Sequence, residues 1–140
     1  MSHIEYNLMP QGQILQDFSD CRARNSFIMG PLGSGKTVQC ILKLFDLMCE
    51  QAPVNDQSHK NYGVRLSRVI AARNTYSELF STTIKDWLEI HGELGDFKQG
   101  NKEPPTHYIR FNLEDGTRVE CDVIFIAFDR PEHVKKARGI

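Results

Sequence analysis

The sequence predicts an α/β fold, with a mostly parallel sheet flanked by helices and joined to a β-hairpin. Short apolar runs alternate with helical patterns from Ser26 onward, which favours parallel strands connected by helices. After Thr106 the hydrophobic period changes from 3.6 to 2, which indicates a hairpin. The 140 residues, 40% of them apolar and 25% charged, suffice for one globular domain and are too few for two. We therefore expect residues 1–140 to form a single domain.

The first predicted elements are a strand, a glycine-rich loop and a helix. Residues 26–29 form an apolar run that ends at Gly30, which predicts a short buried strand. Residues 37–50 are apolar on almost every side, so we expect a helix buried between layers. Residues 51–67 are polar and are expected to form a loop.

A second strand and helix follow. Residues 68–72 are apolar enough for a short strand, and Thr75 with Glu78 forms a capping box that opens the next helix. That helix is predicted to end near Gly92, and residues 93–106 are expected to form a loop. Its apolar face is expected to consist of Tyr76, Leu79, Phe80, Thr83, Ile84, Trp87 and Leu88.

The last third of the chain predicts a hairpin and a short helix. Residues 108–113 and 119–123 alternate apolar and polar side chains on either side of the turn Glu-Asp-Gly-Thr. The second strand continues into the apolar residues 124–128. Pro131 suits the first turn of a final helix, which Gly139 would end. Three cations of this helix either contact DNA or suit the helix dipole: Lys135, Lys136 and Arg138.

The glycine-rich loop matches the phosphate-binding template G-x-x-x-x-G-K-[ST] at all four specified positions. Glycines let the backbone bend so that its N–H groups face phosphate oxygens, and the following helix adds its positive end. We expect Lys36 to reach the β- and γ-phosphates of ATP and the hydroxyl of Thr37 to hold Mg²⁺. The predicted cradle consists of Gly30, Gly33, Ser34, Gly35, Lys36 and Thr37.

Hydrolysis of ATP also requires an acidic residue at the end of a buried strand, usually with a Glu that activates water. Asp129 follows the apolar run 123–128 and is a candidate for the Mg²⁺ shell, but no carboxylate follows it directly. The alternative is that Asp129 caps the helix expected at Pro131. Composition alone leaves both interpretations open.

The composition excludes several other classes of protein. Seventeen basic residues nearly cancel eighteen acidic ones, so the whole chain is not a polycation. The longest apolar run is too short to cross a bilayer, and neither the histidines nor the cysteines have metal-ligand spacing. We expect a cytoplasmic protein without a membrane partner, with reduced core thiols at Cys21, Cys40, Cys49 and Cys121.

Five ordered segments closely resemble the N-terminal ATPase domain of tailed-bacteriophage terminase large subunits, the DNA-packaging motors. The resemblance runs from about Pro10 to the last residue and would place the protein in the host-cell cytoplasm. The segments are residues 30–37, 73–76, 82–87, 113–117 and 128–136.

The resemblance implies a P-loop fold of the additional-strand (ASCE) type that couples ATP hydrolysis to packaging of double-stranded DNA into procapsids. It also implies a portal protein and a small terminase subunit as partners, and assembly as a ring. By this resemblance the strand with the catalytic Glu would begin after Ile140, and the nuclease domain would also lie outside residues 1–140. The chain is then expected to be a truncated large subunit.

Two further residues gain a role from their positions. Gln13 lies where the family contacts adenine, although a plain polar turn explains it equally well. Arg73 ends the second strand, where parallel sheets place ligands, and would contact phosphate, DNA or a surface carboxylate. Two alternative functions remain: a non-catalytic interaction fragment, and a small complete P-loop NTPase or kinase that uses Asp129 for magnesium.

Overall fold

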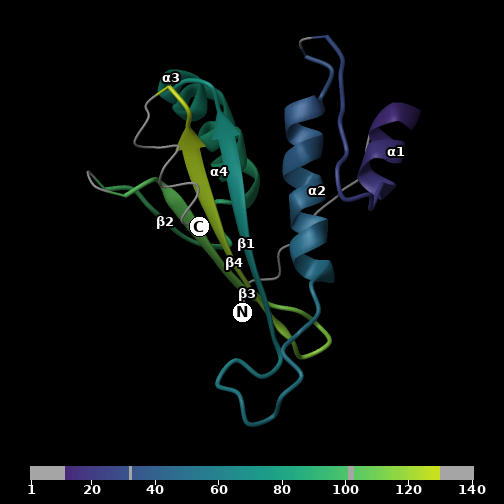
Figure 1. Cartoon of the computed structure of the whole chain (residues 1–140), viewed down its shortest axis with the longest axis vertical. Coiled ribbons are helices and arrows are strands. Elements are labelled where there is room, and N and C mark those ends of the chain that lie inside the picture. Colours follow the sequence, from purple (N-terminus) through teal and green to yellow (C-terminus); the bar gives the residue numbers. More distant parts are fainter. Residues whose placement is uncertain (1–11, 32, 101–102, 130–140) are drawn as a thin grey trace. The chain divides into compact units, whose positions relative to one another are not determined.

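A computed structural model describes residues 12–31, 33–100 and 103–129 of the chain (Figure 1). The chain divides into two compact units, Met1–Asp46 and Leu47–Ile140. The described residues form three helices and a four-stranded mixed sheet. The α/β class predicted from the sequence is therefore confirmed.

The first unit contains helix α1 (Gln13–Asp20) and most of helix α2 (Lys36–Glu50). The predicted helix over residues 37–50 is confirmed as α2, whereas α1 was not predicted. Two side-chain pairs at i, i+4 spacing support α1: Gln13 donates to Asp17 over 2.7 Å and Gln16 donates to Asp20 over 2.8 Å.

The segment before the glycine-rich loop is not a strand. Residues 26–30 have no regular secondary structure, and Phe27 and Met29 are 89% and 90% exposed. A strand needs a partner for its backbone N–H and C=O groups, and the described part of this unit contains no other strand. The prediction of a buried strand at residues 26–29 is therefore wrong.

The second unit is built on a sheet with the strand order β1-β4-β3-β2. Its strands are β1 (Val64–Arg73), β2 (Gly95–Lys98), β3 (Thr106–Asn112) and β4 (Arg118–Ala127). Only β1 and β4 are parallel, whereas β2 and β3, and β3 and β4, pair in antiparallel fashion. The prediction of a mostly parallel sheet is wrong, because β4 returns through a hairpin before it pairs with β1. No P-loop fold is evident in the described residues.

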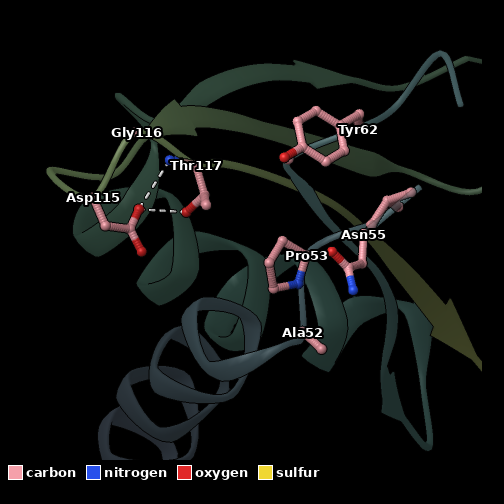
Figure 2. A pocket seen from close by; sticks show the side chains of 9 residues that line it. Ala52, Pro53, Asn55, Tyr62, Asp115, Gly116 and Thr117 are labelled. Carbon is pink, nitrogen blue, oxygen red and sulfur yellow. Dashed lines mark hydrogen bonds between the residues drawn. The ribbon is translucent and has the colours of Figure 1, made fainter. Parts of the chain in front are cut away.

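The predicted hairpin is confirmed as β3 and β4. Its turn is closed by a hydrogen bond from the Leu113 N–H to the Thr117 carbonyl, 2.8 Å long. Asp115 accepts hydrogen bonds from both the amide and the hydroxyl of Thr117, as Figure 2 shows, and its other oxygen lies 3.0 Å from Arg65 of β1. These contacts join the start of β1 to the turn. The turn and the chain around Pro53 and Tyr62 line a pocket of about 560 Å³ (Figure 2).

A continuous helix over residues 76–91 covers one face of the sheet. It consists of α3 (Tyr76–Glu78), the π-helical segment η1 (Leu79–Ile84) and α4 (Lys85–His91), and it ends at Gly92 as predicted. The predicted cap is also present, because the Thr75 hydroxyl accepts a hydrogen bond from the Glu78 amide over 3.2 Å. Tyr76, expected on the apolar face, is 42% exposed. The core residues of this layer include Leu79, Ile84, Trp87, Ile109, Val123 and Phe125.

Candidate phosphate-binding site

The glycine-rich loop leads directly into α2. Gly33 and Gly35 have φ angles of 76° and 84°, in the left-handed region that side chains disfavour, and no other type of residue has a positive φ in the described parts of the chain. The Ser34 amide donates to the Pro31 carbonyl over 3.3 Å, which tightens the loop. The two glycines thus supply the bends that the template requires. Leu32 lies outside the described residues.

Lys36, the first residue of α2, folds its side chain back into the loop. Its Nζ donates hydrogen bonds to the carbonyls of Gly30 and Pro31, the latter over 2.7 Å, and to the Ser34 hydroxyl over 3.2 Å. These acceptors are all uncharged, and no carboxylate pairs with Lys36 in the described residues. The loop therefore encloses a cation whose charge no carboxylate of the described residues neutralises.

Gly30 makes a close approach that a side chain would disturb. A Cβ atom added there would lie 3.0 Å from Oγ of Ser34 and 3.6 Å from Cδ of Lys36. A side chain at this position would therefore press on Ser34, whereas its distance to Lys36 is an ordinary van der Waals contact.

A pocket of about 280 Å³ opens beside this loop. Four of the seven predicted binding residues line it: Gln13, Gly30, Ser34 and Lys36. Its apolar wall comes from α1 and from the segment before the loop, and consists of Ile14, Leu15, Ile28 and Met29. The pocket thus combines a polar, cationic end with an apolar wall, and its volume is close to the lower end of the range for small-molecule sites.

Thr37 lies in the first turn of α2 and is half-buried, but it does not line the pocket. Its hydroxyl forms no hydrogen bond with another described residue, so the oxygen is available to a cation. Gly33 and Gly35 belong to the same loop and likewise stand outside the pocket lining.

Lys43 is a supporting residue that the sequence analysis missed. It is only 6% exposed, and its Nζ donates to the Phe18 carbonyl over 2.6 Å and to the Ser26 hydroxyl over 3.2 Å. The ammonium also lies 4.2 Å from the centre of the Phe18 ring. Lys43 thus joins α2 to α1 and to the segment that leads into the loop. The available signal was a lysine in the middle of a largely apolar helix.

Asp129 belongs to the second unit and caps a helix different from the one expected. Its Oδ2 accepts a hydrogen bond from the Tyr76 amide over 3.1 Å, at the beginning of α3. The helix predicted from Pro131, with the cations at 135, 136 and 138, lies outside the described residues, as do Pro10 and Gln11. A role for Asp129 in binding magnesium stays a prediction.

The cysteines are free thiols, as expected, although only Cys121 is fully buried. Burial raises the pKa of Cys40, and the nearby Lys43 opposes that shift; burial also raises the pKa of Cys121. In the described residues, no group of three or more His, Cys, Asp or Glu side chains is placed to hold a metal ion.

None of the helices in the described parts of the chain is both long enough and apolar enough to cross a bilayer. Comparison of the chain with protein-family models, with curated proteins and with solved structures finds no match.

Proposed function

We propose that the chain is an ATP-binding part of the motor domain of a tailed-phage terminase large subunit, with the P-loop fold of the ASCE type that this family has. The observation that carries the proposal is Lys36, whose ammonium group lies inside a loop with a phosphate-binding sequence and has no carboxylate partner among the described residues. A cation held only by uncharged oxygens favours the arrival of an anion.

The residues around the pocket fit Mg²⁺-ATP. Oxygens of the β- and γ-phosphates would replace the carbonyls of Gly30 and Pro31 as partners of Lys36, and the free hydroxyl of Thr37 would bind the metal. Gln13, which also lines the pocket, would hydrogen-bond to the adenine edge once its amide leaves Asp17. When bound, ATP supplies the phosphoanhydride bond whose hydrolysis drives DNA packaging.

The same proposal assigns partners to the chain. By its resemblance to the terminases, it acts on double-stranded DNA, assembles as a ring, and works with a portal protein and a small terminase subunit in the host cytoplasm. These assignments depend on the ordered set of sequence segments and not on the loop alone, because many NTPases share such a loop.

Titration with a fluorescent ATP analogue in the presence of Mg²⁺ tests nucleotide binding. We expect saturable binding that Lys36→Ala abolishes and that Lys60→Ala, a change to an exposed lysine in the loop before β1, leaves intact. Absence of a saturable signal would instead support the alternative of a non-catalytic interaction fragment. Equal binding by the Lys36→Ala variant would place the nucleotide elsewhere.

Turnover of ATP is a separate test. Among the residues that the structure describes, no carboxylate lines the pocket beside the loop, so none of them is in place to activate water there. We expect the 140-residue chain to bind ATP but to hydrolyse it at a small fraction of a motor's rate. Fast turnover that Asp129→Asn abolishes would favour a small complete NTPase or kinase instead. Fast turnover that Lys36→Ala abolishes and Asp129→Asn leaves unchanged would contradict the assignment of the catalytic Glu to a later segment.

A further inference from the structure

Arg73, the last residue of β1, is held in place by two neighbouring threonines. Its Nε donates to the Thr83 hydroxyl over 2.9 Å, and its Nη2 donates to the Thr82 hydroxyl over 3.1 Å. Thr82 in turn donates its own proton to the Glu78 carbonyl over 2.7 Å, so its lone pairs are directed toward the arginine. The guanidinium group is therefore fixed through two of its nitrogens.

None of the described residues neutralises the charge of this guanidinium group. Both of its hydrogen-bond acceptors are neutral hydroxyls, and no carboxylate of a described residue lies within 4.0 Å of it. Two other arginines of the sheet contact carboxylates: Arg65 lies 3.0 Å from Asp115, and Arg110 lies 2.9 Å from Asp122. A surface salt bridge, the plain explanation for Arg73, is thus not found in the described residues.

The two threonines are consecutive, and both belong to the π-helical segment η1. In a regular helix, consecutive side chains diverge, whereas the wider π-turn changes the direction of those it carries, and such turns are frequent at functional sites. This segment therefore presents two hydroxyls to one guanidinium group. The Nη1 group and the second hydrogen of Nη2 donate to none of the described residues, and they form the open side of a rigid fork.

Arg73 also lies where parallel strands place ligands. The Phe128 amide donates to the Arg73 carbonyl over 3.1 Å, so the carboxyl ends of β1 and β4 lie side by side, next to α3 (Figure 1). Two aromatic side chains at this edge are exposed, Tyr76 by 42% and Phe128 by 46%. Asp129 is at the same edge, but its carboxylate accepts the Tyr76 amide and is not paired with Arg73.

We propose that Arg73 binds a phosphate group at the carboxyl ends of β1 and β4. The free N–H groups of its fork match two phosphate oxygens, and the threonines hold the fork without cancelling its charge. Arg73 belongs to the second unit, whereas the glycine-rich loop belongs to the first. This proposal rests on the proposed function only in the choice of duplex DNA as one probe. The phosphate group could equally belong to a small phosphate compound.

Titration of the wild-type chain, followed by NMR, tests the site without a mutation. Inorganic phosphate is expected to shift the side-chain Nε–H signal of Arg73 and to leave that of Arg68, an exposed arginine of the same strand, nearly unchanged. A response to phosphate alone assigns the site to a small phosphate compound, and a response to a short DNA duplex as well assigns it to the DNA backbone. Equal shifts at both arginines, or none at either, overturn the proposal.

If the DNA duplex binds, substitutions of Arg73 measure how much its contact with a phosphate contributes to the affinity. We expect Arg73→Gln to weaken binding about tenfold at low salt and to lower the slope of log affinity against log salt by about one, as for loss of one phosphate contact. Arg73→Lys, which keeps the charge but loses the fork, should fall between. The matched control Arg68→Gln should change neither quantity. An equal loss in both glutamine variants contradicts a specific role for Arg73.

Two further measurements distinguish loss of phosphate binding from loss of folding and from loss of ATP binding. Thermal unfolding shows whether Arg73→Gln is folded, and if it is not, the lysine variant and the wild-type titration decide the matter. Binding of the ATP analogue to Arg73→Gln should equal that of the wild type. If phosphate does not bind at Arg73, the proposal that the glycine-rich loop binds ATP is unaffected. If Lys36→Ala does not change binding of the ATP analogue, the titration with inorganic phosphate still tests Arg73.

Discussion

The indole Nε1 of Trp87 donates a hydrogen bond to Nδ1 of His107 over 2.8 Å, and both side chains are fully buried. Trp87 comes from α4 and His107 from β3, so this bond joins the helix to the sheet. The Trp87 ring also meets Phe125 edge-on, with the ring centres 6.0 Å apart. An Nδ1 that accepts a hydrogen bond carries no proton, so His107 is the neutral tautomer with its proton on Nε2.

This bond predicts that the free energy of unfolding falls in mild acid. Burial lowers the pKa of His107, partly opposed by Asp96, and protonation of Nδ1 would set two donors face to face. Below the ordinary pKa of 6.5, His107 binds more protons in the unfolded chain than in the folded one. Its contribution to stability is therefore complete above pH 6.5 and is lost as pH falls from there through the lowered pKa of the folded state. Denaturant titrations from about pH 7.5 to about pH 5 measure this slope. His107→Gln should flatten it, whereas His59→Gln, at an exposed site, should not.

Trp87→Phe removes the donor and keeps an aromatic ring in the core. We expect a loss of about 1–3 kcal/mol in the free energy of unfolding, because Nδ1 of His107 loses its partner and a small cavity forms. Chemical denaturation measures the loss. Tyr62→Phe, at a side chain that is 51% exposed, should change stability by less than about 0.5 kcal/mol. Equal stabilities of the two variants would show that the buried bond contributes nothing.

Thr75→Ala tests the cap of the helix over residues 76–91. The Glu78 amide loses the acceptor that lies 3.2 Å away, so we expect a loss of about 1 kcal/mol. The control is Ser77→Ala, which alters an exposed hydroxyl in α3 that makes no hydrogen bond with a described residue. The difference between the two midpoints of denaturation measures the cap, and a difference near zero would contradict it.

Gly30→Ala tests the shape of the loop. The added Cβ would lie 3.0 Å from Oγ of Ser34, so the Ser34 side chain would have to shift. We expect weaker binding of the ATP analogue with little change in the circular dichroism spectrum. Gly100→Ala is the matched control, because no atom lies within 4 Å of a Cβ added there. Wild-type affinity in the Gly30→Ala variant would contradict a close contact between the ligand and this part of the loop.

Patterns confined to neighbouring residues predicted much of the fold. The apolar run that becomes α2, the capping box at Thr75 and the alternation on both sides of the Leu113–Thr117 turn are each complete within about a dozen residues. Strand β2 was missed because its four residues owe their conformation to pairing with β3 and not to their own pattern. Residues 26–29 have the composition of a strand, but composition does not supply a pairing partner.

The candidate site was predictable to a similar extent. The template identified Lys36 and its glycines, and the resemblance to terminases singled out Gln13, which lines the same pocket as Lys36. Lys43 and the pair of threonines around Arg73 were not anticipated, since their contacts join residues that are 25, 17, 10 and 9 positions apart. Contacts of this kind depend on tertiary packing and leave no periodic signal in the sequence.

The reactivity of Cys121 reports on the opening of the sheet around β4. Its side chain is wholly enclosed in the centre of β4, and burial raises its pKa, so an alkylating reagent meets neither an accessible sulfur nor a thiolate. Modification must wait until β4 separates from its neighbours, and its rate then measures the free energy of that opening under native conditions. The half-buried Cys21, Cys40 and Cys49 should react earlier. Mass spectrometry of partly alkylated chains would thus resolve the second unit's core from the rest of the protein, one thiol at a time.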